Sequence, residues 1–359
     1  MIDVIIIGAG IAGASTAFKL SAEGLRIVVL ETNEICSGGS AAAGAFLSPK
    51  ISKPSPYKTY LNDALAYTLD FYQSRFPHLL RKNGLLKIPL DDADIKRCRN
   101  YEPFIDFAWE KRGDNYFFPN AGIIPPKALC QALLEDVEVH EHTPAQSIRF
   151  HEEAWIVNEK LQAKYLILAT GDNTELFPLP YLETKRIGGY RYDVTFEGME
   201  KIQCNMHKDL SISTFMDDHT IIGASHLKGE IDLDKAARED SWELLTKAAT
   251  WYTMPNLKRQ KSYTGYRLFT FDYFPIAGKV VDAKKTMQAL PYIKSGAKVP
   301  YEKYHYYPNL YIHTALGSRG FVFAPYNAEL IAKSILHEEN IPQRLLPAYR
   351  FQKWFRKQL

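Results

Sequence analysis

The feature that most constrains the fold is a glycine motif between two short apolar runs near the start of the chain. Residues 4–7 are all β-branched, and the sequence Gly8-Ala-Gly-Ile-Ala-Gly13 follows them directly. A second apolar run, at residues 26–30, ends at Glu31. A helix over residues 11–22 would join the two runs into a β-α-β unit whose strands are buried on both faces. This order predicts a parallel, Rossmann-like sheet.

Each glycine of the motif has its own physical role in such a unit. Gly8 allows a tight turn, Gly10 lets a pyrophosphate approach the backbone, and Gly13 lets the helix pack closely on the strand. The helix N-terminus offers free N–H groups and the positive end of its dipole to phosphates. Glu31 can accept hydrogen bonds from ribose hydroxyls. The unit therefore predicts dinucleotide binding, and it does not distinguish FAD from NAD.

Small side chains dominate the next segment, residues 36–44. A flat ligand could lie against such a backbone, whose N–H groups would bind phosphate or ring oxygens. The alanine content favours the start of a helix, and the alternative is a flexible Ser/Gly linker.

Further along, the pattern changes from β-α-β units to short, partly alternating strands bounded by turn residues. Strands are expected at residues 85–88, 115–118, 186–196, 212–215 and 220–223, and helices at residues 57–76 and 233–251. This pattern predicts an antiparallel sheet in a second domain. Buried parallel strands at 165–168 and 310–314 return to the first domain, and a helix is expected from Pro325 to Leu336.

The composition excludes a disordered, a collagen-like and a coiled-coil protein. The 359 residues carry a net charge of +3, with 46% hydrophobic and 24% charged residues, which is typical of a soluble globular chain. The four cysteines are far apart, so neither a disulfide framework nor a metal site is expected. The N-terminus does not read as a secretory signal, and uncharged stretches are too short to span a bilayer. We therefore expect a cytoplasmic protein without membrane contact.

Taken together, these segments resemble the D-amino-acid-oxidase-type family of FAD-dependent oxidoreductases over almost the whole chain. Within that family, the chain is similar to the oxidoreductase half of bifunctional enzymes that modify the wobble uridine of tRNA. The motifs that carry this similarity are Gly223-Ala-Ser-His226, Gly265-Tyr-Arg267, Asp272-Tyr-Phe-Pro-Ile-Ala-Gly278 and the run from Leu316 to Pro325.

The resemblance implies a Rossmann-like FAD-binding domain interleaved with an antiparallel-sheet substrate domain, an α/β plus α+β fold. The expected ranges are 1–82, 137–182 and 305–359 for FAD binding and 83–136 and 183–304 for the substrate. The residues expected to bind FAD are Gly8, Gly10, Ile11, Ala12, Gly13, Glu31, Thr32, Gly39, Ser40, Ala43, Gly44, Ala145, Ala169, Thr170, Gly171, Gly317, Ser318, Arg319, Gly320 and Phe321.

The resemblance also implies oxidation of a secondary amine, in which carboxymethylaminomethyl-uridine loses glyoxylate and becomes aminomethyl-uridine. Arg267 occupies the position that binds the substrate carboxylate in amino-acid-oxidising relatives, and Tyr266 is expected to help close the pocket. The alternative for Arg267 is a structural ion pair with Asp272 or Glu197. Arg319 either adds a charge beside the flavin or faces solvent.

Two basic stretches are candidates for binding tRNA. One combines lysines with tyrosines: Lys284, Lys285, Tyr292, Lys294, Lys298, Tyr301, Lys303, Tyr304, Tyr306 and Tyr307. The other comprises Arg344, Arg350, Lys353, Arg356 and Lys357. Such residues neutralise phosphates and stack on unpaired bases, and the alternative is a solvated charged surface.

Two departures from the tRNA enzymes bear on the substrate. Residues 38–44 are closer to glycine oxidases, which leaves an oxidase of free glycine or sarcosine as an alternative, and a non-catalytic flavoprotein binding RNA or a protein as another. The first strand begins at residue 3, so a separate methyltransferase is expected to act on the product.

Overall fold

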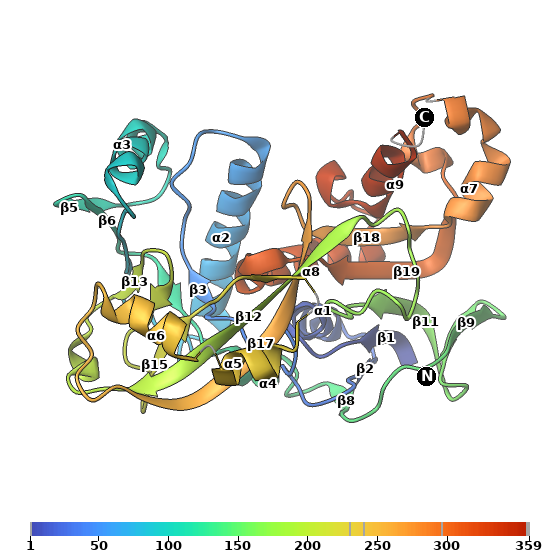
Figure 1. Cartoon of the computed structure of the whole chain (residues 1–359). Coiled ribbons are helices and arrows are strands. Elements are labelled where there is room, and N and C mark those ends of the chain that lie inside the picture. Colours follow the sequence, from blue (N-terminus) through green and yellow to red (C-terminus); the bar gives the residue numbers. More distant parts are fainter. Residues whose placement is uncertain (1, 230, 240, 296, 357–359) are drawn as a thin grey trace.

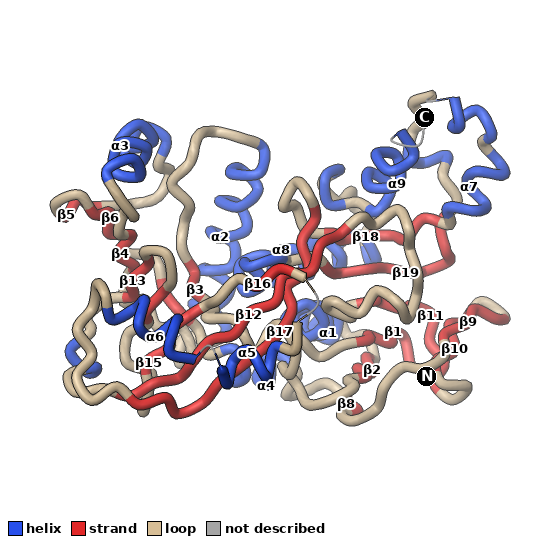
Figure 2. Tube along the Cα trace, in the orientation of Figure 1, coloured by secondary structure: helices blue, strands red, loops and turns tan. Residues whose placement is uncertain are grey.

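The chain forms two β-sheets, and most of its long helices pack on the first of them (Figures 1 and 2). The computed structural model describes residues 2–229, 231–239, 241–295 and 297–356. These ranges hold an eight-stranded sheet, a nine-stranded sheet and a two-stranded ribbon of β3 (Phe46–Leu47) and β7 (Gly122–Ile123). Within the same ranges, every helix is too short or too polar to cross a bilayer.

The first sheet has the predicted parallel core. Its strands lie in the order β18-β19-β11-β1-β2-β8, and a hairpin of β9 and β10 extends β11. The neighbouring pairs from β19 to β8 are parallel, whereas β18 and β10 run antiparallel to their partners. The bounds are β1 (Ile2–Ile7), β2 (Ile27–Leu30), β8 (Glu138–His140), β9 (Ile148–His151), β10 (Ala154–Val157), β11 (Leu161–Leu168), β18 (Ile276–Val281) and β19 (Tyr306–Thr314).

Burial on both faces of β1 explains its uninterrupted apolar sequence. Val4 and Ile6 belong to the hydrophobic cluster on the helical side of the sheet. Ile5 and Ile7 belong to a second cluster, on the opposite face. Because successive side chains of a strand point to opposite faces, each position must be apolar. A fully buried side chain of this size contributes roughly 1.5–3 kcal/mol to folding.

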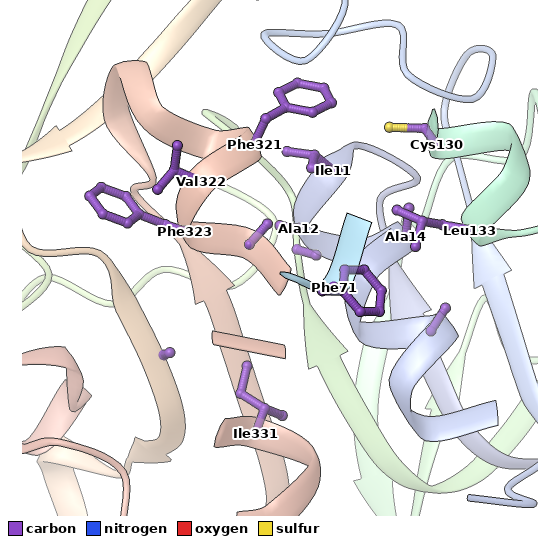
Figure 3. Close-up of a cluster of buried hydrophobic side chains, with 14 of the residues drawn as sticks. Ile11, Ala12, Ala14, Phe71, Cys130, Leu133, Phe321, Val322, Phe323 and Ile331 are labelled. Carbon is purple, nitrogen blue, oxygen red and sulfur yellow. The ribbon is translucent and has the colours of Figure 1, made fainter. Parts of the chain in front are cut away.

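Four helices build the cluster on the helical side. They are α1 (Ile11–Ala22), α2 (Pro56–Arg75), α4 (Pro126–Leu133) and α8 (Gly320–Leu336). α1 contacts both α8 and α4, and α2 packs on α8. Figure 3 shows that Phe321 and Val322, at the start of α8, lie beside Ile11 and Ala12, at the start of α1. The two helix N-termini therefore meet at one edge of the sheet.

The start of α8 differs from the prediction. We expected Pro325 near its first turn, but the helix begins at Gly320, after a 3₁₀ turn at Gly317–Arg319, and Pro325 lies inside it. Proline lacks an N–H group, so it cannot donate to the carbonyl four residues earlier, that of Phe321. The Tyr72 hydroxyl of α2 donates a hydrogen bond to this carbonyl at 2.9 Å. Tertiary contact thus satisfies the group that the proline leaves free.

The second sheet is mostly antiparallel, as predicted. Its order is β16-β12-β15-β14-β13-β4-β6-β5, and β17 pairs with β12 along nearly its full length. The bounds are β4 (Leu85–Lys87), β5 (Glu110–Arg112), β6 (Asn115–Phe118), β12 (Thr184–Thr195), β13 (Asn205–His207), β14 (Ser211–Ile212), β15 (Thr220–Gly223), β16 (Leu227–Lys228) and β17 (Lys258–Thr270).

Several predicted elements need correction. The strand expected at 212–215 is shorter and ends at Ile212, as β14 (Ser211–Ile212). Beyond it, the Ser213 hydroxyl donates to the Thr214 carbonyl, and the Thr214 N–H donates to the Asn205 side chain instead of to the backbone of a neighbouring strand. In the range expected to be a helix, 233–251, the described residues form α5 (Leu233–Glu239) and α6 (Ser241–Ala249), and residue 240 lies outside the described part of the chain. The segment 36–44 forms turns rather than the start of a helix. The remaining helices are α3 (Asp92–Tyr101), α7 (Ala283–Ala289) and α9 (Pro347–Arg356).

The two sheets draw their strands from alternating parts of the chain. The first uses residues 2–30, 138–168 and 276–314, and the second uses 85–118 and 184–270. β18 comes from the range predicted for the substrate domain, yet it pairs with β19 in the first sheet. We propose that the domain division follows sheet membership and that the second domain ends at the turn after β17.

Candidate functional site

The three motif glycines make different contacts. A Cβ on Gly8, whose φ is +107°, would lie 2.3 Å from the carbonyl oxygen of Ala169. A Cβ on Gly13 would lie 1.8 Å from the oxygen of Gly8. Both positions therefore require glycine for packing. A Cβ on Gly10 would meet only the Ser40 side chain, at 3.0 Å, so this position opens onto space that a ligand can enter.

Glu31 is held in place at the end of β2. Its carboxylate accepts hydrogen bonds from the N–H groups of Ala9, at 2.8 Å, and Asn33, at 3.0 Å. A carboxylate has about four acceptor positions, so capacity remains for a ribose hydroxyl. The Thr143 N–H donates to the Glu31 carbonyl at 2.8 Å. This contact brings the strand end beside the segment with the predicted, partly buried Ala145.

The small residues at 38–44 join the two sheets. A Cβ on Gly39 would lie 2.4 Å from the carbonyl oxygen of Tyr266, and one on Gly265 would lie 2.8 Å from the Gly39 Cα. Backbone therefore packs directly on backbone, from the first domain to β17. The Ser40 hydroxyl also accepts a hydrogen bond from the Ile11 N–H at 3.0 Å. The segment thus fixes both the start of α1 and the strand that carries Arg267.

The glycines near the C-terminus lie at the same edge of the sheet. A Cβ on Gly320 would lie 3.3 Å from Ile11, which confirms that α8 and α1 begin side by side. Gly317, with φ of +58°, packs under the Phe269 ring of β17. The Thr314 hydroxyl donates to the carbonyl of Gly171 at 2.9 Å.

Most of the residues predicted to bind FAD are thereby brought together at the carboxyl edge of the first sheet. Phe321 is buried in the helical cluster, whereas Thr32, Thr170 and Ser318 are partly or fully exposed. The first turn of α1 carries no acidic side chain, and its N-cap residue, Gly10, has no side chain of its own to occupy the free N–H groups. Together with the open space at Gly10, this N-terminus fits a pyrophosphate.

Arg267 lies on β17, is partly buried, and has no acidic partner among the described residues. Its Nη2 donates to the carbonyls of Ser225, at 2.5 Å, and Gly188, at 3.2 Å, and its Nη1 lies 3.2 Å from His226 Nε2. Burial lowers the pKa of Arg267 to about 10, so the guanidinium remains charged at neutral pH. A Cβ on Gly189 would lie 2.1 Å from Nη2, so this glycine makes room for the guanidinium.

The structural alternative for Arg267 is excluded by the observed ion pairs. Asp272 lies 2.8 Å from Arg350 Nη1 and 3.3 Å from Lys353 Nζ, and Glu197 accepts a hydrogen bond from Asn256. Among the described residues, no acid pairs with Arg267. The guanidinium has five N–H donors, of which three make the contacts above, so two remain for an anionic ligand.

His226 is a site residue that the sequence analysis did not select. Burial and the neighbouring Arg267 both lower the pKa of His226, so the ring is neutral and accepts from the guanidinium. The sequence feature that could have identified His226 is the motif Gly223-Ala-Ser-His226, which supported the family resemblance but to which no role was assigned.

More positive charge lies near the start of α8. Arg319 faces inward, and its Nη1 donates to the carbonyl of Ser48 at 2.7 Å. Burial lowers the pKa of Arg319, and burial together with Arg319 lowers the pKa of Lys50. His207 has a pKa lowered to about 4, first by burial and then by Lys87 and Arg319. This part of the described chain is thus biased towards anions.

Tyr266 has a structural contact in addition to its place beside Arg267. Its hydroxyl donates to the Ile231 carbonyl at 2.6 Å, and the guanidinium of Arg186 lies 4.1 Å from its ring centroid. The ring therefore ties β17 to the segment before α5. In the described ranges, no group of three or more His, Cys, Asp or Glu side chains is arranged to hold a metal ion.

Comparison with known proteins agrees with this arrangement. A sequence model described as "FAD dependent oxidoreductase" (DAO) matches residues 3–334. The tRNA 5-methylaminomethyl-2-thiouridine biosynthesis bifunctional protein MnmC of Legionella pneumophila (strain Corby) is 26% identical over 383 residues, covering 99% of this chain and 57% of the relative. MnmC of Campylobacter fetus is 26% identical over 348 residues, covering 92% and 55%. The chain thus spans a little over half the length of these relatives.

Solved structures show the same fold. Glycine oxidase from Geobacillus kaustophilus superposes with a TM-score of 0.75 at 18% identity, covering 94% of this chain and 95% of that one. Iminodiacetate oxidase from Chelativorans sp. BNC1 gives a TM-score of 0.70 at 16% identity, covering 96% and 98%.

Proposed function

Because the chain belongs to the family of FAD-dependent oxidoreductases, we propose that it oxidises a secondary amine whose nitrogen carries a carboxymethyl group. The proposed substrate is carboxymethylaminomethyl-uridine at the wobble position of tRNA, and the products are glyoxylate and aminomethyl-uridine. The observation that carries this proposal is Arg267, a partly buried guanidinium with no acidic partner among the described residues.

Arg267 has the chemistry to hold the substrate carboxylate. Its two unused N–H donors, on Nε and Nη1, can each donate a charge-assisted hydrogen bond to an anion, and such bonds are stronger than those between neutral groups. His226, being neutral, adds no second positive charge and accepts from Nη1 instead. The carbonyls of Ser225 and Gly188 hold Nη2, so the guanidinium is oriented before the substrate arrives.

FAD is the cofactor of this family, and the residues present fit it: Gly10 and the start of α1 for the pyrophosphate, Glu31 for the ribose, and the start of α8 for the flavin. When bound, FAD supplies an acceptor for the hydride that leaves the CH₂ group between the amine and the carboxylate. As the hydride leaves the carbon and a proton leaves the nitrogen, a C=N bond forms. Water then adds to this carbon and the C–N bond breaks, which releases glyoxylate and leaves a primary amine on the uridine. The α8 N-terminus and Arg319 favour negative charge beside them.

The curated relatives support tRNA as the substrate through their names. Because those names include a methylaminomethyl product, we propose that a methyltransferase acts on the aminomethyl group and that the reaction takes place in the cytoplasm. The small residues at 38–44, which are closer to glycine oxidases, favour oxidation of free glycine or sarcosine as a second candidate function.

Product analysis tests the proposal. The FAD-loaded protein is incubated with tRNA bearing carboxymethylaminomethyl-uridine, the nucleosides are separated by mass, and glyoxylate is trapped as a hydrazone. We expect aminomethyl-uridine and glyoxylate in equal amounts. Release of glyoxylate from free glycine or sarcosine but none from tRNA would contradict the proposal. A protein that binds tRNA but converts none of these amines would instead be the non-catalytic flavoprotein.

A further inference from the structure

The turn between β17 and β18 exposes two aromatic rings. Phe271 is 64% exposed and Tyr273 is 53% exposed, although both follow the buried residue Phe269 by only a few positions. In Figure 1 this turn projects between α2 and α9. Two large rings presented together on one turn mark an interaction surface.

Cations surround these rings. Lys185 Nζ lies 5.8 Å from the Phe271 ring centroid and 5.0 Å from that of Tyr273. The one acid in the turn, Asp272, is already paired with Arg350 and Lys353 of α9. The exposed basic residues of the neighbouring C-terminal segment are Arg344, Lys353 and Arg356.

The turn lies next to the proposed reaction site. The Tyr273 ring is 6.2 Å from Phe269, which packs on Gly317, and 6.2 Å from Tyr57 at the start of α2. Arg267 lies on β17, and Phe271 follows it by four residues in the turn after this strand, which corresponds to at most about 13 Å of extended chain. A nucleotide chain whose modified base reaches Arg267 therefore passes this turn.

We propose that Phe271 and Tyr273 are stacking platforms for unpaired bases of the RNA loop that carries the substrate uridine, a surface whose role rests on the proposed function. Lys185 and the exposed cations of the C-terminal segment neutralise the adjacent phosphates. Aromatic faces within a cationic surface bind single-stranded nucleic acid, because every base has a face that can stack. A paired helix does not offer its base faces.

The structure divides the basic stretches selected from sequence: Lys284, Lys285, Lys298 and Lys303 are exposed, whereas several other members are buried or bonded within the protein. Tyr304 is buried in the cluster beneath α9, and the Tyr301 hydroxyl is hydrogen-bonded to Gln352. Arg350 is buried and donates to Asp272 and to the Phe274 carbonyl. Of the stretch containing the tyrosines, Tyr292 stays exposed; the side chain of Lys294 and the whole of Lys357 lie outside the described part of the chain.

Binding of an unmodified anticodon stem-loop RNA tests the surface without requiring turnover. Fluorescence anisotropy is measured with the FAD-loaded protein, using this hairpin and a blunt RNA duplex of the same length. We expect Phe271→Ala and Tyr273→Ala each to raise the Kd for the hairpin about tenfold. Phe271→Trp and Tyr273→Phe should restore binding. Lys185→Ala should reduce the slope of log K against log salt by about one.

Phe150→Ala is the matched control, because this aromatic ring is also exposed but lies on β9, away from the site. Flavin absorbance and thermal stability of each variant establish that it is folded. Unchanged hairpin affinity in Phe271→Ala and Tyr273→Ala would overturn the proposal, as would equal affinity for hairpin and duplex or an equal loss in Tyr292→Ala. If Phe271→Ala and Tyr273→Ala lose affinity for the hairpin but the unsubstituted protein oxidises only free amino acids, the RNA-binding surface would be upheld and the proposed function overturned.

Discussion

Arg267 illustrates how a single residue is prepared for its ligand. It is placed by the Gly188-Gly189 pair of β12, and two carbonyls orient Nη2 while no acid neutralises its charge in the described chain. A charged group held in this way lacks the compensation that a buried ion normally needs. Under the proposed function, the carboxylate of the substrate supplies this compensation.

Replacement of Arg267 by lysine should therefore separate charge from geometry. Lysine keeps the positive charge but loses the planar guanidinium that the carbonyls of Ser225 and Gly188 orient, so we expect kcat/KM for tRNA to fall about 10- to 100-fold. FAD content should be unchanged. Steady-state kinetics and flavin absorbance check this expectation, and Arg267→Lys with full activity would remove the carboxylate assignment.

Gly10 and Gly13 should respond differently to the same substitution. Gly10→Val should fold but retain no FAD, because φ at this residue is −72° and the added methyls enter ligand space beside Ser40. Gly13→Val should fail to fold, because its Cβ would lie 1.8 Å from a backbone oxygen. Circular dichroism and flavin absorbance distinguish the two. Retention of FAD by Gly10→Val would contradict the pyrophosphate assignment.

At the scale of elements, α8 and α2 share a hydrogen bond that exists because of a proline. The Tyr72 hydroxyl donates to the Phe321 carbonyl, which Pro325 cannot reach with an N–H group. Tyr72→Phe leaves this buried carbonyl unsatisfied and should cost about 1–3 kcal/mol of unfolding free energy.

In the background Pro325→Ala, the new N–H can donate to Phe321, so Tyr72→Phe should cost less. Urea unfolding of the four proteins in this double-mutant cycle measures the difference. Equal costs in both backgrounds would show that the tyrosine acts through packing rather than through this hydrogen bond.

The elements that sequence predicted well are those whose signal is local. The β-branched run at 4–7 and the glycines after it define a strand, a turn and a helix without reference to the rest of the chain. β17 was missed because its first half, Lys258–Ser262, is polar and exposed, and its pairing partner β12 is distant in sequence. β18 was also missed, because it contains Gly278, whose φ is +125°, and a glycine inside a short segment is more typical of a turn than of a strand.

The same distinction applies to the site. Gly8, Gly10 and Gly13 could be predicted because each has a role within one β-α-β unit. Arg267 came from family resemblance, and nothing in its local sequence shows that Gly189 makes its space or that Asp272 is taken by Arg350. Contacts of this kind depend on tertiary packing and therefore require the structure.

For the whole molecule, buried histidines predict loss of stability in acid. Burial lowers the pKa of His313 to about 3, and that of His207 is lowered to about 4. The unfolded chain binds protons near the ordinary pKa of 6.5, so it binds more protons than the folded chain below that pH. Stability is therefore full above about pH 6.5 and falls as the pH is lowered. Between its folded-state pKa and its unfolded-state pKa, each histidine contributes up to about 1.4 kcal/mol per pH unit to the slope of unfolding free energy against pH.

Urea unfolding at constant FAD concentration between about pH 6 and pH 4 measures this slope. His313→Asn should reduce the slope by about one proton. An unaltered slope in His313→Asn would contradict the assignment of a neutral, buried His313.

The joint between the two sheets connects cofactor and substrate binding. Backbone contact between Gly39 and Gly265 places residues 38–44, whose Ser40 hydroxyl accepts from the first N–H group of α1, directly against the strand of Arg267. Arg191 of β12 strengthens this joint by donating to the Ala41 carbonyl at 3.0 Å. The distance between the dinucleotide site and Arg267 is thus set by rigid backbone.

Anaerobic bleaching of the bound flavin tests the central claim most directly. The FAD-loaded protein is mixed, without oxygen, with tRNA bearing carboxymethylaminomethyl-uridine and, separately, with glycine and with sarcosine. The account predicts rapid loss of the yellow absorbance with the tRNA alone, and much slower loss in Arg267→Ala. Bleaching by the free amino acids, with the tRNA leaving the flavin oxidised, would contradict it.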